Sequence, residues 1–174
     1  MTRVLLDATT LIAFGTIGEL DLLTTLDGEL VVPPAVRAEV STEPASTNLD
    51  RLLEQPEVSE AGPPTDWVGD GAGLLAESSE TGDVQLLAFV LAHTARDDPI
   101  GVVSDDQRVR TTARGLGATV TGPIGIIVRA VEAGLSTDTG LDVLDRIDSH
   151  GLHLTGSLRS RATELIEAAG QDGA

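Results

Sequence analysis

The chain has 174 residues, enough for one domain with a substantial hydrophobic core. It has no cysteine, which excludes disulfides and thiolate metal sites, and no apolar run reaches the ~20 residues that cross a bilayer, so we expect a cytoplasmic protein without membrane contact. A hydrophobic content of 41% argues against disorder despite a net charge of −17, and with only 2% aromatic residues the core should consist of Leu, Val, Ile and Ala.

The beginning of the chain predicts two strand–helix units. The short apolar runs Arg3–Leu6 and Glu29–Val32 are typical of buried strands. Asp7 ends the first strand, and a helical pattern follows. One interpretation of Asp7 is therefore that it is simply the N-cap of that helix. Glu19–Leu26 predicts a short amphipathic helix. After the second strand a proline pair opens a helix that carries Glu39 one turn along.

The middle of the chain is less regular. Ser41–Ser78 is rich in Pro, Gly, Ser and Thr, and we expect a variable surface region or lid with a short helix around Leu49–Glu54 and a short strand at Val58. Glu80 and Asp83 then precede a strongly apolar helical pattern, which predicts a central helix. Acids at helix N-termini are common, because they complement the helix dipole.

The clearest pattern is strand, helix, strand, helix within Ile100–Leu135. Its first strand, Ile100–Val103, is apolar and β-branched, and it is followed by Asp105 and Asp106. Open α/β sheets bind ligands outside the carboxyl ends of their parallel strands. These acids therefore mark a candidate site, and the question is which other acids reach the same edge.

Four segments in order resemble the PIN domain, the nuclease fold of VapC-type toxins and of many archaeal RNA-cleaving proteins. They are VLLDATTLIAF, VVPPAVRAEV, ETGDVQLLAFVLA and VVSDDQRVRTTARGLGATVTGPIGIIVRAVEAGL, and the last resembles in particular an archaeal and bacterial PIN-like branch. The resemblance implies an α/β fold with three layers, α/β/α, a central parallel sheet and a C-terminal helical extension. We expect a core at residues 1–135 with a variable insertion at 41–78, and C-terminal helices at 136–174 packed on the same domain.

The resemblance also implies a site in which four acids meet at the carboxyl edge of the sheet, as catalytic residues and as ligands of Mg²⁺ or Mn²⁺. By position these acids are Asp7, Glu39, Asp83 and Asp105. Three secondary candidates stand beside them: Asp106 as a fifth acid, Thr9 as a hydroxyl that holds a carboxylate or bound water, and Glu80 as a substitute for Asp83. Crowded carboxylates repel one another, and a hard divalent cation neutralises them and activates water for phosphodiester hydrolysis.

One departure weakens this site. Related proteins often carry two acids two residues apart in the third segment, and here the second position is Gln85. An amide can hydrogen-bond a water but brings no charge. The third acidic position then depends on Asp83, and an inactive PIN domain is an alternative.

RNA is the implied partner, although Asp and Glu outnumber Arg by 28 to 11 and Lys is absent. Within Ile100–Leu135 four Arg outnumber three acids, and we expect them either to contact RNA phosphates or to be ordinary solvated residues: Arg108, Arg110, Arg114 and Arg129. The Lys-free acidic composition resembles that of haloarchaeal proteins, since a Debye length of about 3 Å at ~1 M salt screens self-repulsion.

Three functions remain open from the sequence. The first is a Mg²⁺- or Mn²⁺-dependent endoribonuclease of PIN type, acting as the toxin of a toxin–antitoxin pair with an antitoxin protein as partner. The second is a catalytically inactive PIN-fold module that binds protein or RNA. The third is an unrelated α/β regulatory domain whose acidic pocket binds Mg²⁺. Because PIN nucleases often dimerise, we also expect a homodimer.

Overall fold

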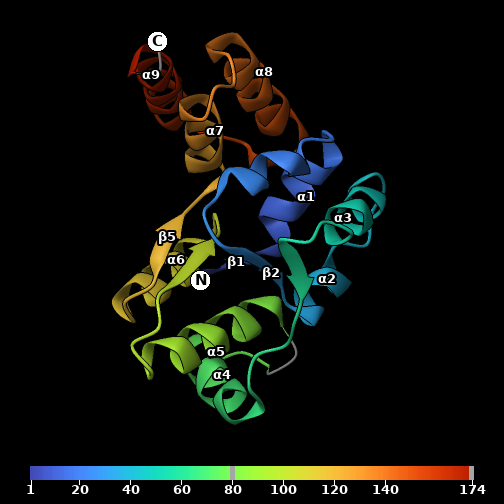
Figure 1. Ribbon diagram of the computed structural model, residues 1–174, viewed down its shortest axis with the longest axis vertical. Helices are drawn as coiled ribbons and strands as arrows, with labels where there is room; N and C mark the ends of the chain where they lie inside the picture. Colours follow the sequence, from blue (N-terminus) through green and yellow to red (C-terminus); the bar gives the residue numbers. More distant parts are fainter. Residues whose placement is uncertain (79–80, 173–174) are drawn as a thin grey trace.

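The computed structural model describes residues 1–78 and 81–172, and within that part of the chain the strands form a five-stranded parallel sheet in the order β3-β2-β1-β4-β5 (Figure 1). The strands are β1 (Arg3–Leu6), β2 (Glu29–Val32), β3 (Val58–Glu60), β4 (Ile100–Val103) and β5 (Thr119–Thr121). The chain builds outward from β1 to β3 and then continues on the other side of β1 with β4. The strand order therefore reverses between β1 and β4, where open sheets hold their ligands.

Helices cover both faces of this sheet. They are α1 (Ala8–Thr16), α2 (Pro34–Glu39), α3 (Ala45–Leu53), α4 (Val68–Leu75), α5 (Gly82–Thr94), α6 (Gln107–Gly115), α7 (Pro123–Glu132), α8 (Thr137–Ile147) and α9 (Gly156–Asp172), with short turns η1 (Leu20–Thr25), η2 (Thr65–Trp67) and η3 (Asp148–Leu152). In Figure 1, α4 and α5 lie below the sheet, and α1, α7, α8 and α9 lie above it. The predicted three-layer α/β/α architecture is confirmed.

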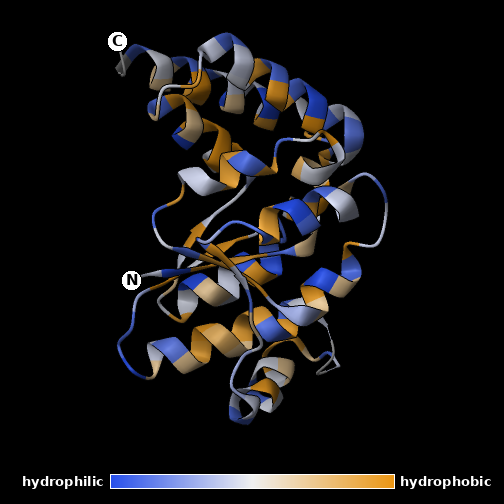
Figure 2. Ribbon diagram, turned by 45° about the vertical axis from the view of Figure 1, so that its right-hand side comes forward, coloured by the Kyte–Doolittle hydropathy of each residue, from blue (hydrophilic) through white to orange (hydrophobic). Residues whose placement is uncertain are grey.

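The core is aliphatic, as the composition predicts. Phe14 and Phe89, the only Phe residues of the sequence, are buried among Leu, Val, Ile and Ala side chains. Every residue of β4 is buried, and α5 is buried along most of its length because it packs against both β4 and α4. Figure 2 shows the same distribution, with hydrophobic colour on the strands and inner helix faces. Within the described residues, none of the helices has the length and apolar character that a bilayer crossing requires.

The structure corrects the prediction of an α-helix over Glu19–Leu26. The segment forms the 3₁₀ turn η1, Leu20–Thr25. The hydroxyls of Thr24 and Thr25 each donate to the backbone carbonyl three residues earlier, at 2.7 Å, and thereby occupy carbonyls that a continuing helix would use. Hydrophobic periodicity alone does not detect this competition.

Within residues 41–78, the short helix expected around Leu49–Glu54 and the short strand expected at Val58 are present, whereas the helix α4 was not predicted. This segment contains α3, the edge strand β3 and α4, as well as the turn η2. The sequence of α4, VGDGAGLL, has three glycines, which are poor helix formers. One of them, Gly71, is buried at the contact with α5, where a Cβ would lie 2.8 Å from the Val84 carbonyl oxygen. Close packing against α5 thus stabilises a helix that its own sequence disfavours.

We predict that Gly71→Ala destabilises the protein by about 1–3 kcal/mol, because the added methyl group meets the α5 backbone, which cannot move aside. The matched control is Gly69→Ala on the same helix, where no atom lies within 4 Å of an added Cβ. That variant should gain about 0.5–1 kcal/mol from helix propensity. Urea unfolding measures both changes, and a Gly71→Ala variant as stable as Gly69→Ala would contradict the close packing of α4 on α5.

Candidate active site

Asp7 and Asp105 approach each other because they follow two adjacent strands. Leu6 at the end of β1 pairs with Val103 at the end of β4, and the Asp7 N–H donates to the Val103 carbonyl at 3.1 Å. The residues after these strands therefore emerge side by side at the reversal of strand order. This is the carboxyl edge of the sheet at which the sequence predicted the acids to meet.

Asp7 is buried, with 3% of its surface exposed, and it is the N-cap of α1. Its Oδ1 accepts the Thr10 N–H at 2.8 Å. Burial raises the pKa of the Asp7 carboxyl, against hydrogen bonds from Ser104, Thr10 and the Asp105 backbone that lower it. Thr9, the expected hydroxyl neighbour, is exposed. The hydroxyl that holds Asp7 is that of Ser104, which is fully buried.

Glu39 and Asp83 are joined through the first residue of α5. Glu39 ends α2, and its Oε1 accepts the Gly82 N–H at 2.7 Å, while Asp83 is the next residue. A Cβ on Gly82 would lie 2.8 Å from Val36 Cγ2 and 2.9 Å from Glu39 Oε1. Only glycine therefore lets the Glu39 carboxylate reach this backbone.

Gln85, the departure from the expected pair of acids, has a structural role. Its Oε1 accepts the Ala35 N–H at 3.0 Å. Ala35 is in the first turn of α2, whose N-terminal amides have no partner within the helix. Gln85 thus caps α2, the helix that ends in Glu39, and positions one acid of the site instead of adding another.

The acids share one electrostatic neighbourhood. The pKa of Asp83 rises to about 6, first because of burial and then because of repulsion from the other acids: Asp106, Asp7, Glu39 and Asp105. The pKa of Asp105 is raised by loss of solvent and by repulsion from Asp7, and the Arg110 guanidinium opposes this shift. Acids from four distant parts of the chain therefore lie near enough to one another to interact.

The two adjacent acids after β4 have different roles. Asp106 is the N-cap of α6, and its Oδ1 accepts the N–H groups of Arg108 at 2.8 Å and Val109 at 2.9 Å. Its carboxylate is therefore committed to the helix. The Asp105 carboxylate accepts a hydrogen bond from its own backbone N–H, caps no helix and lines a cavity, which leaves it more accessible to a ligand than Asp106. Glu80, the proposed substitute for Asp83, lies outside the described residues.

The donor chemistry of this site fits a hard divalent cation. In the described part of the chain no three acidic or His side chains are close enough to form a ready-made metal cage. Mg²⁺ does not require one, because it is usually held by one or two carboxylates with several waters. Asp7 and Asp105 would bind it directly, and Glu39 and Asp83 directly or through water. Burial raises the pKa of Asp83 and Asp105, and repulsion from the neighbouring acids raises it further; a cation would oppose both effects.

A second network, absent from the sequence prediction, connects the two sides of the site. Glu77 pairs with Arg108 of α6, and its Oε2 accepts the Thr81 hydroxyl at 3.2 Å. Thr81 is in turn the N-cap of α5, since its Oγ1 accepts the Val84 N–H at 3.3 Å. This connection fixes the helix of Asp83 to the helix that follows Asp106.

The four Arg proposed to contact RNA differ in their surroundings. Arg108 is paired with Glu77, and Arg129 is paired with Asp27 at 2.5 Å. Arg114 is exposed on α6. Arg110 lines a cavity together with Asp105 and, within the described residues, forms no ion pair with a carboxylate; one Nη donates to the Ser104 carbonyl at 2.8 Å. Arg110 is therefore the best placed of the four to meet a ligand of this site.

A family model described as a PIN domain matches residues 3–168, which is nearly the whole chain and includes α8 and most of α9. A search of curated proteins finds no match.

We predict that Asp83→Asn stabilises the metal-free protein at pH 7 by about 1 kcal/mol, allowing for partial solvent screening of the shift. The folded-state pKa of about 6 exceeds the ordinary value of 3.8, so the folded protein binds the extra proton and wild-type stability falls as pH rises from about 4 to 6. The gain of the variant should therefore vanish near pH 4.

Thermal unfolding in EDTA at both pH values measures this effect. The control is Asp138→Asn, which removes an exposed acid from the first turn of α8, the equivalent position on another helix. Equal shifts for Asp83→Asn at pH 4 and pH 7 would contradict the crowding of acids around Asp83.

We also predict that Gln85→Ala destabilises the protein by about 1 kcal/mol, as expected for the loss of a cap on α2. Gln85→Glu retains the acceptor oxygen and should keep that hydrogen bond. Hydrogen exchange at the Ala35 amide separates the two variants: protection is lost in Gln85→Ala and retained in Gln85→Glu. Unchanged protection in Gln85→Ala would show that Gln85 does not cap α2.

Proposed function

Since the chain belongs to the PIN domain family, whose fold is of the nuclease type, we propose that it is a metal-dependent endoribonuclease that hydrolyses RNA phosphodiesters with Mg²⁺ or Mn²⁺. The observation that carries the proposal is the convergence, at the reversal of strand order, of acids that follow β1 and β4, end α2 and begin α5. In metal-assisted hydrolysis of a phosphodiester, carboxylates hold a divalent cation beside the phosphate.

The residues of the site have distinct roles in this proposal. Asp7 and Asp105 would be the ligands, because they emerge from adjacent strands and Asp105 caps no helix and lines the adjoining cavity. Glu39 and Asp83 would orient bound water, and the Gly82 N–H holds the Glu39 carboxylate in position. Bound metal would supply an activated water and stabilise charge on the leaving oxygen. Gln85, Ser104 and Glu77 are positioning residues that act through these acids.

A PIN-fold binding module without cleavage is the second candidate. It is favoured by Gln85, which stands in place of an acid and caps α2. The toxin role, an antitoxin partner, a homodimer and a haloarchaeal origin stay predictions.

We predict that the protein cleaves single-stranded RNA in Mn²⁺ or Mg²⁺ and that EDTA abolishes cleavage. Asp7→Asn and Asp105→Asn should each reduce the rate by more than about 100-fold, because even outer-shell changes at metal sites commonly cost 10- to 100-fold. Asp138→Asn, which removes the same charge far from the acids, should cleave at the wild-type rate.

The assay is gel analysis of a labelled RNA over a series of KCl concentrations up to molar, because the acidic surface repels RNA least at high salt. Cleavage that survives in Asp7→Asn and Asp105→Asn would point to a contaminating nuclease and overturn the proposal. RNA binding with no cleavage in any metal or salt would favour the binding module.

A further inference from the structure

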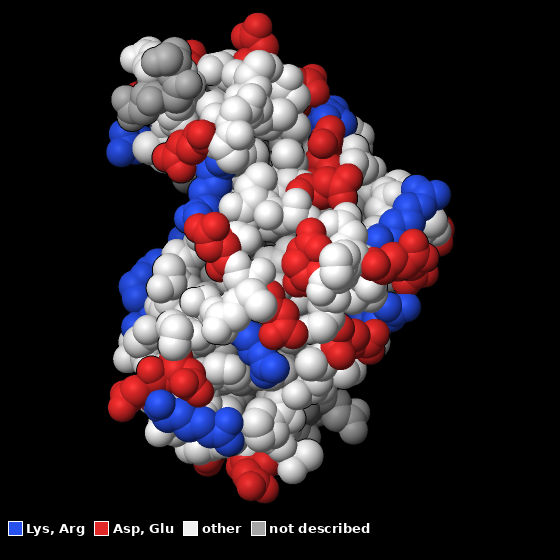
Figure 3. Space-filling model, viewed as in Figure 1, with Lys and Arg blue, Asp and Glu red and all other residues white. Residues whose placement is uncertain are grey.

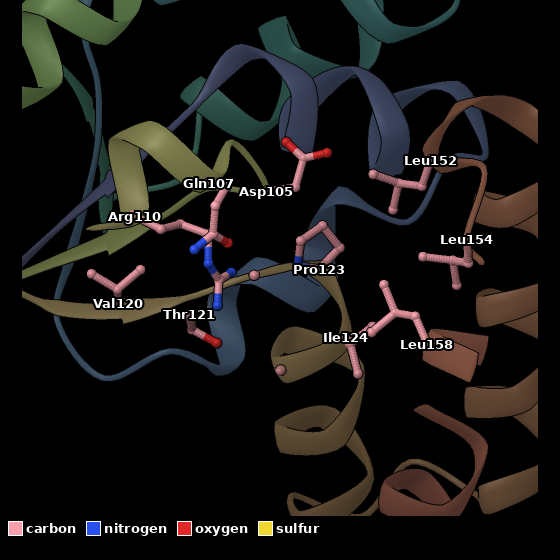
Figure 4. A pocket seen from close by; sticks show the side chains of 12 residues that line it. Asp105, Gln107, Arg110, Val120, Thr121, Pro123, Ile124, Leu152, Leu154 and Leu158 are labelled. Atoms are coloured by element: carbon pink, nitrogen blue, oxygen red, sulfur yellow. The ribbon is translucent and has the colours of Figure 1, made fainter. Parts of the chain in front are cut away.

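A cavity of about 490 Å³ begins at Asp105 and extends away from the acids. It lies between the N-terminus of α6, the end of β5, the start of α7 and the segment that joins η3 to α9. Figure 4 shows two different walls, one with Gln107, Arg110 and Thr121, and the other with Ile124 and leucines of the C-terminal segment. The volume is within the range of about 300–1,000 Å³ typical of small-ligand sites.

The apolar wall consists of Ile124, Leu152, Leu154 and Leu158. Leu158 is 45% exposed, and together with the other three residues it forms a continuous apolar surface that faces the cavity. The wall is held in place from behind: Asp148 accepts the Leu154 N–H at 2.7 Å and pairs with Arg159 of α9. An exposed apolar surface that is fixed in position is suited to a flat apolar ligand.

The polar wall centres on Arg110. Its Nη1 donates to the Ser104 carbonyl, and a Cβ on Gly122 would lie 2.4 Å from this atom, so the glycine leaves the space that the guanidinium occupies. Within the described residues Arg110 has no carboxylate partner at ion-pair distance, whereas Arg108 and Arg129 have one. Its remaining donors are therefore available to an anionic group in the cavity.

We propose that this cavity is the subsite for one unpaired nucleotide of an RNA strand, with its base against the leucine wall and its phosphate at Arg110. The inference rests on the proposed ribonuclease function, because a strand whose scissile phosphate lies at Asp105 must pass the next nucleotide into the adjoining cavity. A base inside a duplex is stacked and cannot enter, whereas an unstacked base can. The subsite thus makes the enzyme specific for single strands, through a wall built by the C-terminal helices.

For each wall, the chain offers a second residue of the same type outside the cavity, which serves as a matched control. Leu158→Asn removes apolar surface from the cavity, and Leu165→Asn makes the same change at another exposed leucine on the same face of α9, two turns away. Arg110→Gln removes the cavity guanidinium, and Arg114→Gln removes an exposed one from the next turn of α6. Circular dichroism checks that all four variants fold.

The measurement is fluorescence anisotropy of a short labelled single-stranded RNA, and of the same strand annealed to its complement, with the 174-residue protein in Ca²⁺, which binds oxygen ligands. A gel checks that the strand stays intact during the measurement. We expect Leu158→Asn to weaken single-strand binding by about tenfold. Arg110→Gln should also weaken binding, and the slope of log affinity against log salt concentration should fall by about 1, as expected for the loss of one phosphate contact. The two control variants should bind as the wild type does, and duplex binding should be weak and unchanged by Leu158→Asn.

The outcomes separate this inference from the proposed function. If Leu158→Asn and Leu165→Asn bind single-stranded RNA equally well, or if the wild type binds none, the subsite is wrong, and the wall serves another ligand such as a protein segment. If cleavage is absent in every metal but Leu158→Asn still weakens binding selectively, the nuclease activity fails and the nucleotide subsite stands.

Discussion

The constraint on which this structure depends is the repulsion between carboxylates at the carboxyl edge of the sheet. Three helix N-termini meet there and offset it. The amides of α1 and α6 are accepted by Asp7 and Asp106, and the first amide of α5 is accepted by Glu39. Because the N-terminal end of a helix carries partial positive charge, each helix stabilises the acid that it contacts. The strand order that places β1 beside β4 thereby brings together both the acids and the helix termini that tolerate them.

The helix N-termini offset the cost of gathering these acids only in part, and the remaining cost is what a bound cation could relieve. The pKa of Asp83 remains raised, to about 6, and the pKa of Asp7 and Asp105 is raised as well. A site that is fully satisfied by its own hydrogen bonds would have little free energy to gain from a cation. The well-packed aliphatic core, in which β4 and α5 are buried almost throughout, offsets the free-energy cost of placing these acids together. β4 and α5 thus contribute both to the stable core and, at their ends, to the cluster of acids.

The sequence predicted the elements whose local pattern is strong and the site positions that follow them. β1, β2 and β4 are apolar runs, so their ends, and with them Asp7 and Asp105, could be located. The helix α4 could not, because its glycines are explained only by contact with α5. Gly82, Gln85 and Ser104 were missed or misread for the same reason. Their partners are Glu39, Ala35 and Asp7, which are 43, 50 and 97 residues away, and no local periodicity reports a contact across that separation.

The distribution of Arg explains how so acidic a chain could accept RNA. The chain has 11 Arg and no Lys, and among the described residues seven Arg form ion pairs with the chain's own acids: Arg3, Arg37, Arg108, Arg129, Arg146, Arg159 and Arg161. Figure 3 shows the result on one face, where basic side chains are scattered among acidic ones and the surface is hollowed between the upper helices and the part below. A broad basic track is therefore not the means of attraction. In the proposed function, affinity would come from a divalent cation at the acids and from apolar contact in the adjoining cavity, and salt does not weaken apolar contact as it weakens phosphate contacts. High salt would at the same time screen the repulsion between a protein of net charge −17 and an RNA strand. The acidic composition and an apolar subsite would therefore both suit RNA binding at high salt concentration.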